Sequence, residues 1–531
     1  MPPQAQVVLD NAQSLAYFLP ETLLTLGAMA IFMLDLAVRS VRSRIPVIAW
    51  ASVAVLIAAT IATYHVSALP YSVNGQFFSP MQRPVGLFYG LIVIDPWAVL
   101  FKYLSWAVTA LAIWMAAPSL EITSERMGEY CALLLSIAVG MSLMASSTDM
   151  LMMVIAVELV SMVSYALAGF RKHHRKSSEA ALKYVVYGGV ASGMMLFGMS
   201  YLYGLLGSTN VAAMAPLLQQ YGERVFVMNL ESSQAAAGQL ALVLAVVLVL
   251  SGVGYKIASV PWHMWCPDVY EGAPTPFTAF LSVGPKAAGF ALAVRILYGA
   301  MSQSGGNDLA TVVSDIPWPA VIGVISAATM TLGNFAALNQ TNLKRMLAYS
   351  SIAHAGYLLM GLAAASATGS KSIVIYLMVY LFMNLGAFLV VGAVGRLSGS
   401  ESIFEYRGLS SRAPFAAVAF AIFLFSLTGL PPLAGFVGKF HLFKSLIDRG
   451  GSWQIALAIV GVLNSAVSLY YYARIVRTMF LDQPLTATPI PVPRSYNLLL
   501  GLLVIGVIVF GVYFDGLRRI ADASLPMFGH S

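Results

Sequence analysis

Residues 253–267 read Val-Gly-Tyr-Lys-Ile-Ala-Ser-Val-Pro-Trp-His-Met-Trp-Cys-Pro, and they interrupt an apolar run that covers residues 239–270. A continuous helix over that run would be about 48 Å long, whereas the hydrocarbon core of a bilayer is about 30 Å thick. Pro261 and Pro267 each remove a backbone hydrogen bond. The run is therefore predicted to be a broken membrane helix, with Lys256 just before the break.

A second long run, residues 413–447, contains the stretch Gly429-Leu-Pro-Pro-Leu-Ala-Gly-Phe-Val-Gly-Lys439. A continuous helix there would be about 52 Å long, so Pro431 and Pro432 are predicted to break it as well. Paired interrupted helices are typical of transporters built from repeats. Because the second break comes five apolar runs after the first, a repeat of about five helices is predicted.

The chain as a whole is strongly apolar. Of its 531 residues, 59% are hydrophobic and 10% are charged, whereas an ordinary soluble domain has about 25% charged residues. Its mean hydropathy is +0.80. Predicted spans cover residues 17–38, 46–68, 94–116, 128–146, 149–170, 178–206, 239–270, 275–300, 318–339, 343–364, 372–396, 413–447, 453–479 and 496–518. The fold class is thus an all-α polytopic membrane protein with about fourteen transmembrane helices.

Loop charges predict how the chain crosses the membrane. Most loop arginines and lysines, for example Arg126, Arg171, Lys344 and Arg412, fall on one side of the predicted spans. The positive-inside rule then places both termini outside the cytoplasm. Residues 1–19 lack the pattern of a cleaved signal peptide, so the first span is expected to be permanent.

Several function classes are disfavoured by composition. The net charge is +7, but the basic residues lie in short loops rather than along one face, which disfavours nucleic-acid binding. Cys131 and Cys266 are too few for an iron–sulfur cluster and lack the close Cys/His spacing of a zinc site. No phosphate-binding glycine motif opens a helix. No cofactor or metal is expected in this chain.

Basic residues inside the spans carry the functional prediction. A charged lysine at the bilayer centre costs about 2.5–3.5 kcal/mol even on a lenient scale, so several of them require a function. Burial favours a neutral amine and a nearby carboxylate favours the ammonium, so a moving carboxylate can move a proton. Glu158 is the deep carboxylate, and Lys256, Lys286 and Lys439 are predicted to form a proton relay with it.

Two further residues are included in the predicted relay. Lys183 begins a span, and its alternative is to extend toward the membrane surface. His354 could pass protons between Lys286 and Lys439, and its alternative is local hydrogen bonding.

Other polar residues in the spans are given structural roles. His263 and His441 flank the breaks and are expected to bond locally. Lys102 and Arg295 lie toward span ends, so we expect them to extend to the surface. Stripes of tyrosine, tryptophan and methionine are expected to serve packing and interfacial anchoring.

Residues 265–280, Trp-Cys-Pro-Asp-Val-Tyr-Glu-Gly-Ala-Pro-Thr-Pro-Phe-Thr-Ala-Phe, resemble the NuoN-type antiporter-like subunits of respiratory complex I, the proton-pumping NADH:quinone oxidoreductase. So do residues 344–357, Lys-Arg-Met-Leu-Ala-Tyr-Ser-Ser-Ile-Ala-His-Ala-Gly-Tyr, and the 429–439 stretch. The sister subunits resemble the chain around Ala-Pro-Thr-Pro but lack the Pro-Asp-Val-Tyr-Glu-Gly that precedes it. The spans cover nearly the whole chain.

The resemblance implies fourteen helices with two inverted five-helix repeats and broken helices seven and twelve. It implies that Glu158, Lys256, Lys286 and Lys439 are the family's relay residues on helices five, seven, eight and twelve. The predicted segments are 1–126 (three N-terminal helices), 127–300 (first repeat), 301–480 (second repeat) and 481–531 (last helix and tail).

The resemblance also implies the setting of the chain. NADH, flavin, iron–sulfur clusters and quinone belong to partner subunits, which include sister antiporter-like subunits. The chain is expected in the bacterial inner membrane, with no redox centre of its own.

Three alternatives stay open from sequence. An Mrp-type cation/proton antiporter subunit would use the same buried chemistry without NADH. A structural membrane anchor would leave the buried lysines unexplained. A photosynthetic relative fed by ferredoxin is hardly distinguished by this sequence.

Overall fold

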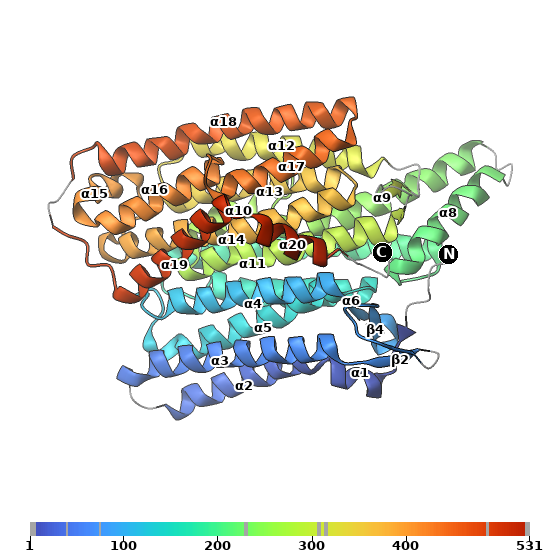
Figure 1. Cartoon of the computed structure of the whole chain (residues 1–531), viewed down its shortest axis with the longest axis horizontal. Coiled ribbons are helices and arrows are strands. Elements are labelled where there is room, and N and C mark those ends of the chain that lie inside the picture. The colour runs from blue at the N-terminus through green and yellow to red at the C-terminus, as the bar shows by residue number, and fades with distance from the viewer. Residues whose placement is uncertain are drawn as a thin grey trace.

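The structure is a computed structural model that describes residues 7–38, 41–73, 76–227, 232–304, 310–312, 317–484 and 488–525. The ends of the first and last predicted segments, residues 1–6 and 526–531, therefore lie outside the described residues. Long helices lie side by side along one common direction (Figure 1). This arrangement suits a bilayer, because a helix satisfies its own backbone hydrogen bonds.

The N-terminal part combines helices with short strands. Its helices are α1 (Asn11–Tyr17), α2 (Leu19–Ala37), α3 (Val41–Ala68) and α4 (Pro96–Ala116). Strands β1 (Val7–Val8), β4 (Val85–Leu87) and β5 (Ile92–Ile94) form a small sheet in the order β1-β4-β5, and β2 (Tyr71–Val73) pairs with β3 (Gln76–Phe78). The carboxylate of Asp95 caps α4 by accepting the Ala98 backbone N–H at 2.8 Å. These strands have two or three residues each and were not predicted from the sequence.

The middle of the chain contains the first broken helix. Its helices are α5 (Met127–Ser146), α6 (Met150–Ala168), α7 (Arg175–Leu206), α8 (Val211–Val227), α9 (Ser232–Ile257), α10 (Trp265–Gly272) and α11 (Thr275–Val294), and α11 continues into the π-helical turn η3 (Arg295–Ala300). Helix α8 was not predicted.

The last part contains the second broken helix. Its helices are α12 (Trp318–Leu338), α13 (Leu343–Ala363), α14 (Ala367–Ser398), α15 (Leu409–Arg412), α16 (Pro414–Thr428), α17 (Ala434–Arg449), α18 (Ser452–Phe480), α19 (Arg494–Val512) and α20 (Asp515–Ala523), and β6 (Ser302–Ser304) pairs with β7 (Ala310–Val312).

Both predicted breaks are confirmed. Helix α9 ends at Ile257 and α10 begins at Trp265, with a cis bond between Val260 and Pro261 in the gap. Helix α16 ends at Thr428 and α17 begins at Ala434, with a cis bond between Pro431 and Pro432. Among the described residues, thirteen helices are long and apolar enough to cross a membrane, and α16 is a shorter apolar one. The predicted all-α membrane fold is therefore confirmed.

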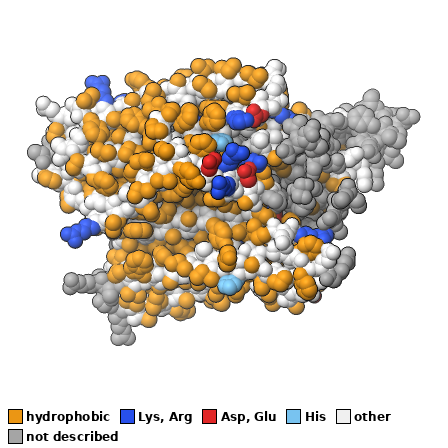
Figure 2. All heavy atoms as spheres, in the orientation of Figure 1, with side chains coloured by type: hydrophobic (Ala, Val, Ile, Leu, Met, Phe, Trp, Pro, Cys, Tyr) orange, Lys and Arg blue, Asp and Glu red, His pale blue; other side chains and the backbone are white. Residues whose placement is uncertain are grey.

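The last predicted span, 496–518, is too long. Helix α19 ends at Val512, and the polar helix α20 begins at Asp515. The physical reason is the charge of α20, where Asp522 pairs with Lys371 at 2.9 Å. In Figure 2 charged side chains gather near α20, on a face that is otherwise mostly hydrophobic.

Helix α11 lies at the centre of the bundle. Every residue from Thr275 to Val294 is buried, and the candidate span that contains α13 is 94% buried. The outward faces of other helices carry exposed apolar side chains such as Leu26, Ile155 and Leu502. The polar groups of α11 and α13 are thus surrounded by protein, not by lipid.

Candidate functional site

Lys256 lies in the last turn of α9, next to the first break, and is 3% exposed. Its ammonium donates a hydrogen bond to Ser161 Oγ on α6 at 3.0 Å. Glu158 lies three residues before Ser161, on the same face of α6. One carboxylate oxygen of Glu158 is buried without a hydrogen-bond partner among the described residues. The structure therefore places the ammonium of Lys256 at the face of α6 that carries the predicted Glu158.

Lys286 lies in the middle of α11 and is 2% exposed. Its ammonium donates to both the backbone oxygen and Oγ of Ser351 on α13, each at 2.6 Å. The Tyr380 hydroxyl on α14 donates to the same Ser351 Oγ at 2.9 Å. Ser351 thus joins the lysine of α11 to a tyrosine of α14.

Helices α9 and α11 approach closely between Lys256 and Lys286. A Cβ placed on Gly289 would lie 3.4 Å from Lys256 Cγ and 2.9 Å from a side-chain carbon of Ile257. Gly289 is three residues after Lys286, so the stem of Lys256 packs one helical turn from Lys286. The small side chains around Lys286 thus permit a close approach of the two helices.

His354 on α13 is the centre of a hydroxyl cluster and is 2% exposed. Its Nδ1 is hydrogen bonded to the Tyr376 hydroxyl, and its Nε2 lies 3.4 Å from the Tyr472 hydroxyl. Its ring centroid lies 5.2 Å from that of Tyr380. His354 therefore contacts the tyrosine that also bonds Ser351.

Lys439 on α17 follows the second break and is 3% exposed. Its ammonium donates to the backbone oxygen of Thr428 and to Ser465 Oγ, each at 2.8 Å. It also lies over the Tyr357 ring, 4.4 Å from the centroid, which is a cation–π contact. The ring of Tyr357 in turn lies 5.8 Å from that of His354. Lys439 thus reaches the cluster around His354 through an aromatic ring.

Lys183 is placed differently from the other predicted relay residues. Its side chain is 37% exposed and pairs with Asp268 at 2.6 Å and with Glu179 at 2.8 Å. These residues lie near Arg345 and Lys176, at the end of the bundle that we call the basic end. Lys183 is therefore separate from the connected groups around Lys286 and His354.

Lys102 and Arg295 do not extend to the surface, so that expectation was wrong. Lys102 is 3% exposed and pairs with Glu21 of α2 at 2.7 Å. Arg295 is fully buried and donates to both carboxylate oxygens of Asp95, at 3.0 and 2.7 Å, and to the backbone oxygen of Ala145. The prediction relied on the position of each base near a span end. It could not include Glu21 and Asp95, because these acids lie in distant parts of the sequence.

The two histidines at the breaks have modest local contacts. His441 Nδ1 lies 2.8 Å from the backbone oxygen of Val437. His263 is 9% exposed, and its Nδ1 has no hydrogen-bond partner among the described residues. Local bonding is thus seen for His441 but not for Nδ1 of His263.

The hydroxyl groups of the site were not predicted. Tyrosines were assigned to packing, yet Tyr376, Tyr380 and Tyr472 bond to His354 or Ser351 inside the bundle. A usable signal existed for the serines, since Ser161 is one turn from Glu158 and Ser351 is one turn from His354. No sequence spacing could have found the tyrosines, which lie on other helices.

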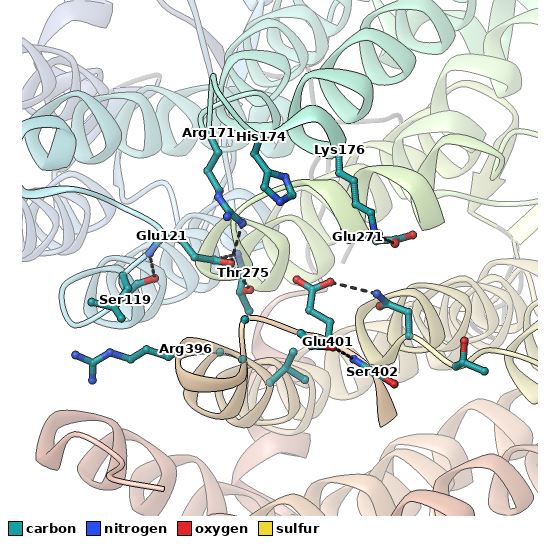
Figure 3. A pocket seen from close by; sticks show the side chains of 18 residues that line it. Ser119, Glu121, Arg171, His174, Lys176, Glu271, Thr275, Arg396, Glu401 and Ser402 are labelled. Carbon is teal, nitrogen blue, oxygen red and sulfur yellow. Dashed lines mark hydrogen bonds and ion pairs between the residues drawn. The ribbon is translucent and has the colours of Figure 1, made fainter. Parts of the chain in front are cut away.

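A polar cavity of about 640 Å³ opens at the basic end. Figure 3 shows Arg171, Glu121 and Thr275 meeting on one side of it, and Lys176 with Glu271 on another. Glu121 accepts the Thr275 backbone N–H at 2.5 Å and pairs with Arg171 at 3.3 Å. Two acid–base pairs, Glu121–Arg171 and Glu271–Lys176, thus lie in the lining of the cavity.

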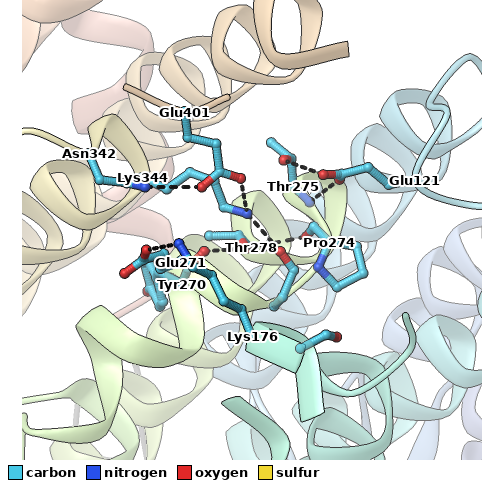
Figure 4. A network of polar contacts seen from close by, with 12 residues as sticks. Glu121, Lys176, Tyr270, Glu271, Pro274, Thr275, Thr278, Asn342, Lys344 and Glu401 are labelled. Carbon is cyan, nitrogen blue, oxygen red and sulfur yellow. Dashed lines mark hydrogen bonds and ion pairs between the residues drawn. The ribbon is translucent and has the colours of Figure 1, made fainter. Parts of the chain in front are cut away.

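Lys344 lies behind the lining of this cavity and pairs with Glu401, which is part of the lining. It is fully buried, pairs with Glu401 at 2.9 Å and donates to the backbone oxygen of Ala273 at 2.8 Å (Figure 4). Asn342 donates to the other oxygen of Glu401 at 3.3 Å. The network therefore joins the segment after α10 to the starts of α13 and η4 (Ile403–Tyr406).

Comparison with known proteins places this geometry in a family. Residues 147–466 match the family model described as NADH:quinone oxidoreductase/Mrp antiporter, TM. The chain is 52% identical over 529 residues to the NADH-quinone oxidoreductase subunit N of Anaeromyxobacter sp. (strain Fw109-5), covering 98% of both chains.

Solved structures share the fold. A chain of respiratory complex I from Thermus thermophilus with bound aureothin is 27% identical, with a TM-score of 0.72 and coverage of 94% of this chain and 98% of that one. A chain of the Mrp complex from Dietzia sp. DQ12-45-1b has a TM-score of 0.72 at 22% identity, with coverage of 96% and 97%, which is a likeness of fold alone.

Proposed function

The chain belongs to the NADH-quinone oxidoreductase subunit N family, the proton-pumping membrane subunits of complex I, and we propose that its buried polar groups from Lys256 to Lys439 are the path of the proton. The observation that carries this proposal is the hydroxyl cluster around His354. It lies between Lys286, through Ser351 and Tyr380, and Lys439, through the ring of Tyr357.

The first step takes place at Lys256. With Glu158 close, the ammonium form is stabilised; when the carboxylate moves away or takes up a proton, the lysine releases its own. Ser161 Oγ accepts the ammonium N–H and keeps the side chain directed at α6 in either case. Glu158 is therefore the group through which a partner subunit would act.

The second step crosses from α9 to α11. Lys256 packs on Gly289, one turn from Lys286, but no hydrogen bond joins the two lysines in the part of the chain that the structure describes. Ordered water between them would complete the path, as buried water does elsewhere between polar groups that do not meet.

The third step runs from Lys286 to Lys439. Hydroxyl groups both donate and accept, so Ser351, Tyr380 and Tyr376 can pass a proton to and from the imidazole of His354. The ring of Tyr357 and the Thr428 backbone oxygen then stabilise the charged form of Lys439. Lys183 makes no hydrogen bond to these groups in the described part of the chain; its acid partners are Asp268 and Glu179.

The energetics permit such a mechanism. Moving one charge against about 100 mV costs about 2.3 kcal/mol. Each unit of pKa change in a relay group corresponds to about 1.36 kcal/mol, so adding or removing a buried carboxylate partner can supply that amount.

The family and the charge distribution support a proposal for the setting of the chain. We place the basic end and its cavity on the cytoplasmic side, with both termini on the other side of the bacterial inner membrane. NADH oxidation, flavin, iron–sulfur clusters and the quinone site belong to partner subunits, and sister antiporter-like subunits are neighbours.

The test is NADH-driven proton uptake by inverted membrane vesicles that carry Lys256→Ala, with complex assembly and NADH oxidation measured alongside. We expect proton uptake to fall about tenfold or more while the complex still assembles. The matched control is Lys444→Ala, because Lys444 is 54% exposed and pairs with Asp448 within one turn of α17.

Two outcomes would contradict the proposal. Unchanged proton uptake with Lys256→Ala would remove Lys256 from the path. Loss of sodium/proton exchange with intact NADH-driven uptake would favour the Mrp-type antiporter function.

A further inference from the structure

The Pro-Asp-Val-Tyr-Glu-Gly stretch, residues 267–272, contains two acids that the proton path does not use. Both lie on α10, the short helix after the first break. Asp268 pairs with Lys183 of α7 at 2.6 Å and with Arg345 of α13 at 2.5 Å. Glu271 pairs with Lys176 of α7 at 2.7 Å and with the same Arg345 nitrogen at 3.0 Å.

These five side chains form what we call the carboxylate clamp: Asp268, Glu271, Lys176, Lys183 and Arg345. Arg345 Nη1 bridges the two acids, and each acid has a second base on α7. The acids are mostly buried, with 27% and 17% of their side chains exposed. The clamp therefore holds α10 between α7 and α13 at the basic end.

Close packing fixes the same end of α10. A Cβ on Gly272 would lie 2.2 Å from the backbone oxygen of Lys176 and 2.7 Å from Ala180 Cβ. Because the first of these atoms is backbone, no side-chain rotation could relieve the clash. Asp268, Glu271 and Gly272 of the stretch thus all serve one contact, that of α10 with its neighbours.

The opposite end of α10 contacts the segment that carries Lys256. Trp265 Nε1 donates to the backbone oxygen of Tyr255 at 3.1 Å. The Trp265 ring also stacks on Tyr184, with ring centroids 4.5 Å apart and planes 17° apart. Tyr255 and Tyr184 are the direct chain neighbours of Lys256 and Lys183.

We propose that Asp268 and Glu271 are positioning residues for Lys256. The clamp sets the place of α10, and α10 sets the last turn of α9 through the Trp265–Tyr255 hydrogen bond. Lys183 then acts as a member of the clamp rather than as a proton carrier. This inference rests on the proposed function, because the proposed function gives Lys256 its role in proton transfer.

The test compares Asp268→Asn with Asp268→Glu in the complete complex, in inverted vesicles. Asp268→Asn should lower the number of protons taken up per NADH oxidised about two- to fivefold, the range expected for loss of a partly exposed ion pair. Asp268→Glu should keep most of the normal ratio of protons to NADH, because glutamate keeps the negative charge at this position. The control is Asp448→Asn, which removes an ion pair of similar length, 2.5 Å, from the exposed face of α17.

A double-mutant cycle covers the case in which Asp268→Asn prevents assembly. Lys183→Met removes a 37%-exposed base of the clamp. If Lys183 acts through the clamp, Lys183→Met should lower the ratio like Asp268→Asn, and the two together should lower it little further. An unchanged ratio in an assembled Lys183→Met or Asp268→Asn complex would overturn the clamp, and so would additive effects.

The two proposals can fail separately. If Lys256→Ala leaves proton uptake intact, the proposed function fails whatever the clamp variants do. If Lys256→Ala abolishes uptake while the clamp variants keep a normal ratio, only the clamp inference fails.

Discussion

Two groups of buried bases in this chain are equally hidden but differ in their partners. Arg295 and Lys102 each pair with a carboxylate, Asp95 and Glu21. Lys286 and Lys439 bond to serine hydroxyls and backbone oxygens, and no ion pair joins either of them to an acid among the described residues.

The difference separates two tasks. A base with its own buried acid is held in the charged form, and removing one partner leaves an uncompensated charge. A base held by neutral oxygens can exist with or without its proton, because the same atoms serve both forms. On the proposed path, burial alone therefore does not distinguish the two groups of bases, whereas the kind of partner does.

The largest effect is expected from Asp95→Asn. This change removes the carboxylate that pairs with the fully buried guanidinium of Arg295, which should destabilise the chain by about 3–5 kcal/mol. The measurement is the amount of chain found in the assembled complex, with Asp522→Asn at the exposed Lys371 pair as the control. Normal assembly of the Asp95→Asn complex would break the comparison.

A smaller effect is expected on the thermal stability of the complex, which should differ between Lys102→Met and Lys439→Met. Lys102→Met leaves Glu21 buried without its partner and should lower the temperature at which the complex loses activity. Lys439→Met should leave that temperature nearly unchanged, because Ser465 Oγ still donates to the Thr428 backbone oxygen at 2.8 Å. Proton uptake should show the reverse order, with about a tenfold loss for Lys439→Met.

These two variants would contradict the comparison if they destabilised the complex equally. Equal proton uptake in both would also remove the distinction between a structural and a functional base.

The smallest effect tests the aromatic partner of Lys439. Tyr357→Leu removes the ring under the ammonium but leaves the Thr428 and Ser465 oxygens in place, so proton uptake should fall only about two- to fivefold. Tyr357→Phe keeps the ring and loses only the hydroxyl, which lies 3.5 Å from Asn334. Uptake should therefore stay near normal in Tyr357→Phe, and equal losses in the two variants would exclude the cation–π contact.

Much of the fold could be predicted from the sequence because the bilayer restricts the choices. Apolar runs that exceed the membrane thickness and contain proline had to break, and the breaks near Pro261 and Pro431 lie where expected. Lys256, Lys286 and Lys439 could be recognised as buried for the same reason.

The partners of those lysines could not be predicted. Arg295 and Asp95 are 200 residues apart in the chain, and Lys286 and Ser351 are 65 apart. Such contacts depend on how helices pack, which the period of a single helix does not reveal. The prediction for Lys183 failed to include Asp268 for this reason, and its part in the proton path stays a prediction.

The contact at Gly272 has a mechanical consequence. Helix α10 has eight residues, so it is a lever about 12 Å long whose fulcrum is the place where Gly272 touches the backbone of α7. A tilt of about 5° around that fulcrum would move the far end by about 1 Å. That is enough to stretch the 3.1 Å hydrogen bond between Trp265 and Tyr255 beyond its normal range. A small rotation of α10 would thus make or break the Trp265–Tyr255 hydrogen bond, and so change the backbone next to Lys256.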